Sequence, residues 1–150
     1  MDDIVKIFLA SGLTVVSGVT VFVAGQFLDR TLIIPIHDLK KIIVDIRFAL
    51  VFYNREICTP VEKETLSHDE ARDALRRLSC DILTKMEVIP FYSCVSRMSY
   101  GFVPLKKDVL EASKQLMGLS NSINKKHLVE SNAGRISYME RLLNLKPVEN

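Results

Sequence analysis

The sequence predicts an all-α protein, in which one N-terminal transmembrane helix precedes a compact bundle of four or five helices. Three observations predict this fold. Residues 7–28 form a run without a single charged side chain, and a run of that length can cross a bilayer. Residues 36–146 contain several segments whose apolar residues recur every three or four positions, as in packed helices. No segment shows the two-residue alternation that is typical of a half-buried strand.

Length, charge and cysteine content limit the class of protein. The 150 residues are enough for one domain, and 20 basic against 18 acidic residues imply no general affinity for nucleic acid. The cysteines Cys58, Cys80 and Cys94 are odd in number and form no CxxC pair. Free thiols in a reducing compartment are the simplest interpretation.

The apolar run, residues 7–28, has the dimensions of a membrane span. As a helix it would be about 33 Å long, close to the hydrocarbon thickness of a bilayer. A helix of a soluble core would show a polar face within seven residues, and this run shows none. A cleaved signal peptide is the alternative, but the start "MDDIVK" is acidic and no A-x-A site follows. We predict a retained span, preceded by a short extracytoplasmic tail at residues 1–6.

The flanking charges predict the orientation of the span. Arg30, Lys40, Lys41 and Arg47 follow it, whereas Lys6 alone precedes it. The positive-inside rule then places the C-terminal domain in the cytoplasm and the N-terminus outside.

Small side chains gather on one face of the span. At 100° per residue, seven of them fall within an arc of about 140° that Val21 interrupts. They are Ala10, Ser11, Thr14, Ser17, Gly18, Ala24 and Gly25. Small residues let two membrane helices approach closely, although they are also common in any membrane helix. This stripe is a candidate contact face for a second copy of the chain or for a partner helix.

Residues 29–35 are expected to connect the span to the bundle, residues 36–146, which a tail at 147–150 follows. Ile34 precedes Pro35 and is biased away from helical geometry, so the span should end or kink there. Pro35 then suits the first turn of a new helix. This helix is expected to be the most buried one, the alternative being an amphipathic helix on the membrane surface. Its apolar positions are Ile36, Leu39, Ile42, Ile43, Ile46, Ala49, Leu50, Phe52, Tyr53 and Ile57.

Three further helices follow from the same periodicity. The capping box Ser67-x-x-Glu70 predicts the start of the first, and the next starts near Pro104. Residues 124–134 read as a polar loop, and the last helix covers about 135–144. The predicted buried positions are Ala71, Leu75, Leu78, Ile82 and Met86, then Leu105, Val109, Ala112, Leu116, Leu119 and Ile123, then Ile136, Met139, Leu142 and Leu143.

Aromatic residues gather between Pro90 and Pro104, on a segment expected to form a short helix ending at Gly101. The candidate contact residues of this segment are Phe91, Tyr92, Arg97, Met98, Tyr100 and Phe102. They could form a surface for recognition. They could also form a hydrophobic lid that closes the end of the bundle, which is the commoner role of apolar residues.

No catalytic, cofactor-binding or metal-binding residue is predicted. The histidines His37, His68 and His127 lie in separate segments, with His68 expected to be exposed, and no glycine-rich phosphate loop is present. Cys80 and Cys94 are expected to behave as small hydrophobic residues.

Four blocks together resemble a group of small, single-span bacterial membrane proteins with a helical cytoplasmic domain. The blocks are "IVDIRFALVFYNR", "EARDALRRLSCDIL", "MEVIPFYSCVSRM" and "EASKQLMGLSNSI". The resemblance implies a bacterial inner membrane as the location, and it implies no activity or ligand.

The sequence favours a membrane-tethered helical interaction or regulatory module over an enzyme. Its expected partners are the lipid bilayer, a second copy or a partner membrane helix, and a cytoplasmic protein, with no nucleic acid and no cofactor. Two alternatives remain open. One is a membrane-bound enzyme with an unrecognised site in the bundle, and the other is a holin-like or toxin membrane protein.

Overall fold

The computed structural model describes residues 2–59, 66–123, 125 and 128–145. Every regular element within these ranges is a helix, and no strand occurs among them. The chain divides into two units, Met1–Ile34 and Pro35–Asn150. The all-helical prediction is therefore confirmed for the described residues.

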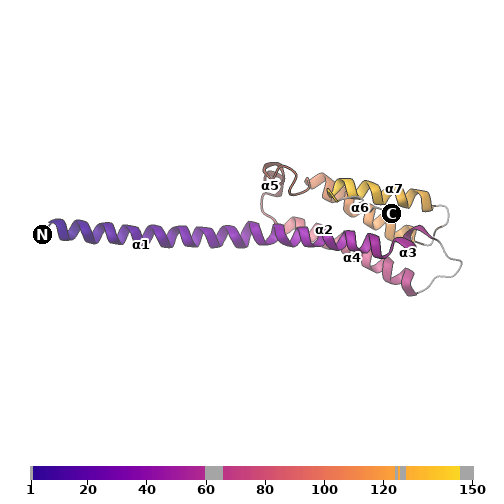
Figure 1. Ribbon diagram of the computed structural model, residues 1–150, viewed down its shortest axis with the longest axis horizontal. Coiled ribbons are helices and arrows are strands. Elements are labelled where there is room, and N and C mark those ends of the chain that lie inside the picture. Colours follow the sequence, from indigo (N-terminus) through magenta and orange to yellow (C-terminus); the bar gives the residue numbers. More distant parts are fainter. Residues whose placement is uncertain (1, 60–65, 124, 126–127, 146–150) are drawn as a thin grey trace. The chain divides into compact units, whose positions relative to one another are not determined.

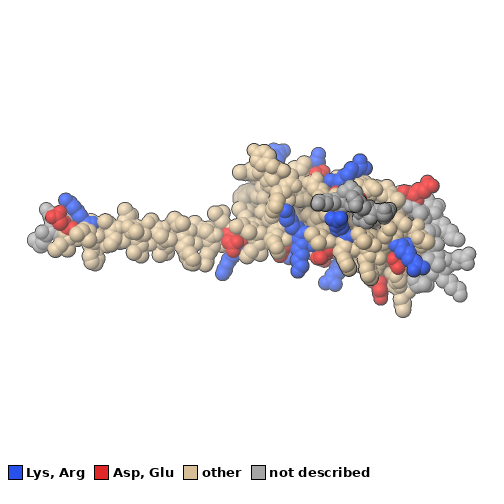
Figure 2. All heavy atoms as spheres, viewed as in Figure 1, with Lys and Arg blue, Asp and Glu red and all other residues tan. Residues whose placement is uncertain are grey.

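Unit 1 consists of helix α1 (Asp2–Leu28) and a short π-helical turn, η1 (Asp29–Ile33). A window of 18 residues in this helical stretch has a mean hydropathy of 2.1, and none of the window is buried. On the face shown in Figure 2, no charged side chain lies between the two ends of α1. By length and composition, this helix is long and apolar enough to cross a membrane.

The chain does not leave the helical conformation at Ile34–Pro35, contrary to the prediction: Ile34 has φ = −60° and ψ = −50°, and the π-turn η1 directly precedes it. The amide of Ile34 donates to the carbonyl of Asp29, which is the wider hydrogen-bonding pattern of a π-helix. Helix α2 (Ile34–Phe52) then begins with Pro35 in its first turn. A proline ring clashes with the carbonyl four residues earlier in a regular α-helix, and the widened turn provides room for it.

Unit 2 contains four long helices and two short ones within the described residues (Figure 1). After α2 come α3 (Asn54–Cys58), α4 (Leu66–Val88), α5 (Tyr92–Met98), α6 (Lys106–Ser122) and α7 (Val129–Leu142). Helices α4 and α6 make the most extensive contact of any pair. Their predicted faces are confirmed, because Leu75, Ile82 and Leu116 have no exposed surface. Leu105, however, is more than one-third exposed.

Helix α2 is not the most buried helix, contrary to the prediction. Leu39, Ile46 and Leu50 do face the core. Phe48 and Phe52 stack on each other with ring centroids 5.5 Å apart, and both side chains are more than 60% exposed. The apolar face of α2 is wider than the bundle covers, and the central pair is α4 and α6.

Three predicted helix boundaries are wrong. Helix α2 ends at Phe52 instead of continuing to Ile57, because Tyr53 leaves the helical conformation before α3 begins. Helix α4 already includes Leu66, so Ser67 is not the N-cap of this helix. The hydroxyl of Ser67 donates instead to Glu56 Oε1 at 2.8 Å. Helix α7 starts six residues earlier than predicted, so most of the expected polar loop is helical.

Asn132 explains the early start of α7. Its side chain is 1% exposed, its Nδ2 donates to the carbonyl of Ile57 at 3.1 Å, and its Oδ1 accepts from Ser122 Oγ at 2.6 Å. These bonds join α7 to α3 and to the end of α6. A buried polar residue that bridges three elements gives this polar segment a fixed place in the core.

We expect Asn132→Ala to reduce the free energy of unfolding by about 1–3 kcal/mol, because it leaves the Ile57 carbonyl and the Ser122 hydroxyl without this partner. Urea unfolding followed by the helical signal measures the change. The control is Ser131→Ala at the neighbouring exposed position, which should have an effect within about 0.5 kcal/mol. Equal effects of the two substitutions would contradict this role of Asn132.

Candidate membrane-contact surfaces

The stripe residues of α1 are all exposed, and three of them carry hydroxyl groups that bond to the helix itself. Ser11, Thr14 and Ser17 donate to the carbonyls of Phe8, Ala10 and Thr14 at 2.9–3.0 Å. A hydroxyl that bonds to the preceding turn needs no water, so it can be placed in lipid at little cost. The polar atoms of the stripe are therefore compatible with an apolar surrounding.

Glycines on α1 leave open space at the helix surface. A Cβ atom added at Gly12, Gly18 or Gly25 would meet no other atom within 4 Å. Gly18 and Gly25 belong to the stripe, whereas Gly12 lies outside it, about 120° around the helix axis from Gly18. Larger side chains therefore fit at each of these glycines within a single copy of the helix.

The second candidate surface is the aromatic patch, which we define as Phe91, Met98, Tyr100 and Phe102. All four side chains are exposed, with Phe91 at 86% and Tyr100 at 100%. Tyr92 is different, because it is buried and its hydroxyl donates to the carbonyl of Pro104 at 2.8 Å. Burial, and the nearby Asp108, raise the pKa of Tyr92. Tyr92 therefore acts as the lid residue that closes the core, while the aromatic patch faces outward.

Two patch residues have backbone conformations that favour glycine. Phe91 has φ = 52° and Tyr100 has φ = 47°. They flank α5, with Phe91 at its N-cap and Tyr100 directly after its C-cap. Bulky residues in this left-handed region are rare, and the conformation costs about 1–2 kcal/mol for each. Neither side chain gains burial in return, so folding alone does not explain why aromatic residues occupy these positions.

We therefore expect Tyr100→Gly to stabilise unit 2 by about 0.5–1 kcal/mol, because it relieves this strain and removes no buried contact. The matched control is Gly101→Ala, where φ is 89° and an added methyl group meets no atom within 4 Å. That change should destabilise by about 1 kcal/mol through backbone strain alone. Thermal unfolding measures both, and a large loss of stability in Tyr100→Gly would mean that the side chain has a folding role.

Contacts within unit 2 place the aromatic patch at the end where α2 begins (Figure 1). The Lys40 ammonium group lies over the Phe102 ring. Lys85, near the end of α4, donates to Asp38 Oδ2 at 2.8 Å and holds the pKa of that carboxyl below its usual value. Asn144, beyond α7, donates to the carbonyl of Gly101 at 3.3 Å. The start of α2, the end of α4 and the residue after α7 therefore meet beside this segment.

Basic side chains lie next to the aromatic patch. Arg97, Lys106 and Lys107 line a shallow pocket of about 310 Å³ together with two serines of α5. A second pocket of about 490 Å³, which Phe91 and Lys106 line, also contains Glu87. Within the described ranges, none of these three basic residues forms an ion pair. The sequence prediction included Arg97 but neither Lys106 nor Lys107.

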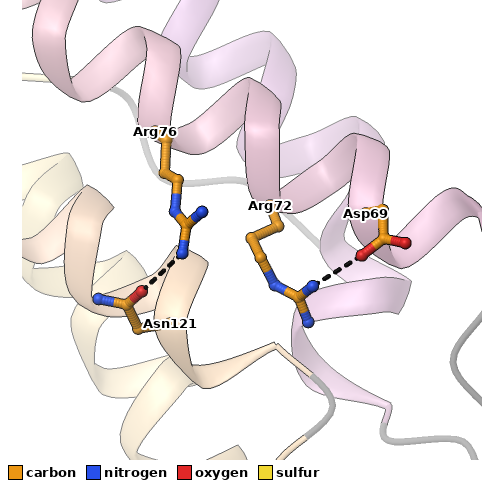
Figure 3. Close-up of polar contacts among 4 residues, drawn as sticks. All are labelled: Asp69, Arg72, Arg76 and Asn121. Carbon is orange, nitrogen blue, oxygen red and sulfur yellow. Dashed lines mark hydrogen bonds and ion pairs between the residues drawn. The ribbon is translucent and has the colours of Figure 1, made fainter.

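The charged residues of α4 serve mainly to join helices or pair locally. Figure 3 shows Arg76 of α4 bonded to Asn121 of α6, with 3.2 Å between Nη2 and Oδ1. In the same view Arg72 pairs with Asp69 at 2.7 Å. These contacts lie along the α4–α6 interface and at the surface of α4, and they leave no carboxylate pair arranged for acid–base chemistry among the residues drawn.

The remaining reactive side chains are dispersed. Cys80 and Cys94 are exposed free thiols, so the expectation that they behave as small hydrophobic residues is wrong. Cys58 is half-buried, and burial raises its pKa. His68 is buried, contrary to its predicted exposure, His37 is exposed, and His127 lies outside the described residues. The described residues contain no group of three His, Cys, Asp or Glu side chains that could hold a metal ion.

Comparison with protein-family models, curated proteins and solved structures finds no match to this chain. The resemblance to single-span bacterial membrane proteins therefore stays a prediction from the sequence. The function has to be argued from the two candidate surfaces themselves.

Proposed function

We propose that this protein is a membrane-tethered helical module. Residues 7–28 cross the bilayer, and the unit from Pro35 onward works in the cytoplasm as an interaction or regulatory domain. The observation that carries the proposal is α1, a helix of 27 residues whose apolar window has no buried residue. An apolar surface of this size has to be shielded from water. Lipid can shield it, because α1 is long enough to cross a bilayer and its hydroxyl groups bond to the helix itself.

Extraction of native membranes with alkaline carbonate tests the anchoring. We expect the full-length, uncleaved chain to stay in the membrane pellet and to leave it only with detergent. Intact mass measured on the same sample distinguishes a retained span from a cleaved signal peptide. Release of the uncleaved chain into the carbonate supernatant would refute the tether.

We further propose that α1 associates with another membrane helix through its small-residue stripe, and that a second copy of this chain is the simplest partner. Close approach at Gly18 would bring two backbones together, which supplies the packing that lipid-embedded helices need. The Lys and Arg side chains after the span favour the orientation in which unit 2 is cytoplasmic.

We expect Gly18→Leu to reduce cross-linking between copies at least several-fold in native membranes, because the added side chain separates the two backbones. Gly12→Leu is the matched control. It makes the same chemical change in the same helix, its Cβ atom would meet no atom within 4 Å, and it lies away from the stripe. Equal cross-linking of Gly18→Leu and the unmodified chain would show that the stripe is not the contact face.

A further inference from the structure

We infer that the aromatic patch of unit 2 binds the interface of the bilayer that α1 spans, with the neighbouring basic residues at anionic lipid headgroups. This inference rests on the proposed function, since it needs α1 to bring unit 2 to the membrane. It assigns unit 2 a membrane contact of its own, in addition to the span.

The chain between the end of α1 and the start of unit 2 is short. Residues 29–34 separate α1 from Pro35, the first residue of unit 2. As helix, seven steps from Leu28 to Pro35 cover about 10 Å, which is close to the thickness of one headgroup layer, about 5–8 Å. With the span in place, Pro35 would lie at the outer edge of the headgroups. Pro35, and the residues of unit 2 that contact its end of α2, would then lie within reach of the headgroups.

The aromatic patch lies at the end of unit 2 that contains Pro35. Lys40 lies five residues after Pro35, hence within two turns of α2, and its ammonium group contacts the Phe102 ring. The Lys85–Asp38 ion pair brings the end of α4 to the same level, and α5 follows α4 directly. The opposite end of unit 2 contains Asn132, which bonds to both Ile57 and Ser122. The aromatic patch is thus at the end of unit 2 that contains the start of α2.

The side chains of the patch and its surroundings suit the interface of a bilayer. Tyr favours the boundary between headgroups and acyl chains, Phe can be buried there as an apolar residue, and Lys and Arg next to them attract anionic lipids. Arg97, Lys106 and Lys107 outnumber the acidic groups that line the same pockets, which are Glu87 and Asp108. Lys40 adds a further basic group at the Phe102 ring. Burial lowers the pKa of Lys40, which its contact with Phe102 partly shields from solvent. A cytoplasmic protein with an acidic surface would need the same charges but would not require the patch to lie at the end of unit 2 that contains Pro35.

Tryptophan fluorescence can test this contact, because the chain contains no tryptophan. The full-length protein is reconstituted in vesicles of phosphatidylcholine and phosphatidylglycerol in equal parts, with brominated acyl chains as quenchers. Three single-tryptophan variants are compared: Tyr100→Trp in the patch, Phe22→Trp in the span, and Leu66→Trp at the exposed start of α4 near the opposite end. We expect strong quenching of Phe22→Trp, clear quenching of Tyr100→Trp, and none of Leu66→Trp.

The outcomes separate this inference from the proposed function. If Phe22→Trp is quenched and Tyr100→Trp is as bright as Leu66→Trp, the membrane span is supported and the bilayer contact of the patch is refuted. The patch would then be a surface for a protein partner. If Phe22→Trp also stays bright, the tether itself fails and the inference fails with it. Quenching of all three variants alike would refute a specific contact at this end of unit 2.

The basic residues have their own arm of the test. We expect quenching of Tyr100→Trp to fall at least twofold in vesicles of phosphatidylcholine alone. The same loss is expected when Lys106→Gln and Lys107→Gln are added in mixed vesicles, because both changes remove attraction to anionic headgroups. Both lysines are exposed, so the fold should be retained, and the helical signal verifies this. If the quenching of Tyr100→Trp changes neither with lipid charge nor with the replacement of Lys106 and Lys107, the role of these lysines in lipid binding is refuted.

Discussion

Replacing Val16 and Val19 together by arginine is expected to move the chain from the membrane fraction to the soluble fraction. Both residues lie near the middle of the span, and both are exposed in α1. An arginine at the centre of a membrane helix costs about 2.5–3.5 kcal/mol, whereas each Leu, Ile, Val or Phe contributes only about −0.3 to −0.6 kcal/mol. The span has twelve such residues, of which ten remain in this variant, and two arginines cancel about as much as these ten contribute.

Ultracentrifugation of cell lysates, followed by detection of the chain in pellet and supernatant, measures this shift. The control replaces the same two valines by leucine, which leaves the span apolar and should leave the chain in the pellet. Retention of the double arginine variant with the membranes, at the level of the leucine control, would mean that α1 is not what holds the protein there.

The largest effect expected on stability comes from the α4–α6 interface. We expect Leu116→Ala to lower the free energy of unfolding of unit 2 by about 2–5 kcal/mol, because Leu116 has no exposed surface and its loss leaves a cavity. A domain of this size is stable by only about 5–15 kcal/mol, so the change removes a large part of the total.

Leu110→Ala provides the comparison within the same helix. Leu110 is 39% exposed, and water can fill the space that its side chain leaves, so a loss below about 1 kcal/mol is expected. Urea unfolding in detergent solution, followed by the helical signal, measures both variants. If the two substitutions had similar effects, α4 and α6 would not form the centre of the core.

Helices α4 and α6 were predictable from the sequence because their apolar residues keep a regular spacing over several turns. That spacing predicts which face is apolar, and Ala71, Leu75, Val109 and Ala112 on this face all lie in the core as expected. The same argument failed for α2, because periodicity shows that a face is apolar but not whether a neighbouring element covers it. The exposed Phe48–Phe52 pair is the result.

The boundaries that were predicted wrongly depend on hydrogen bonds between distant residues. Asn132 bonds to the carbonyl of Ile57, 75 positions earlier in the chain, and no local pattern of residues contains that partner. The hydroxyl of Ser67 fits a capping box by sequence, but Glu56 provides an acceptor in a neighbouring helix. Local signals for caps and loops were overridden by tertiary contacts in both cases.

The aromatic segment could be found in the sequence, but which of its side chains face the core and which face outward could not. A run such as "FYSCVSRMSYGF" contains enough apolar residues for either a lid or a contact surface. The structure divides the roles, since Tyr92 is buried and the aromatic patch is exposed. Phe91 and Tyr100, at the two ends of α5, both have a left-handed backbone conformation.

The central claim, that residues 7–28 cross the bilayer, is tested most directly by the accessibility of cysteines on its two sides. Two single-cysteine forms are needed. One carries Asp3→Cys with the three natural cysteines replaced by serine, and the other keeps only the exposed Cys80. A membrane-impermeant maleimide is added to intact spheroplasts and, in parallel, to lysed ones. The account predicts that Asp3→Cys reacts in intact spheroplasts and that Cys80 reacts only after lysis. Reaction of both cysteines from the same side of the membrane would contradict it.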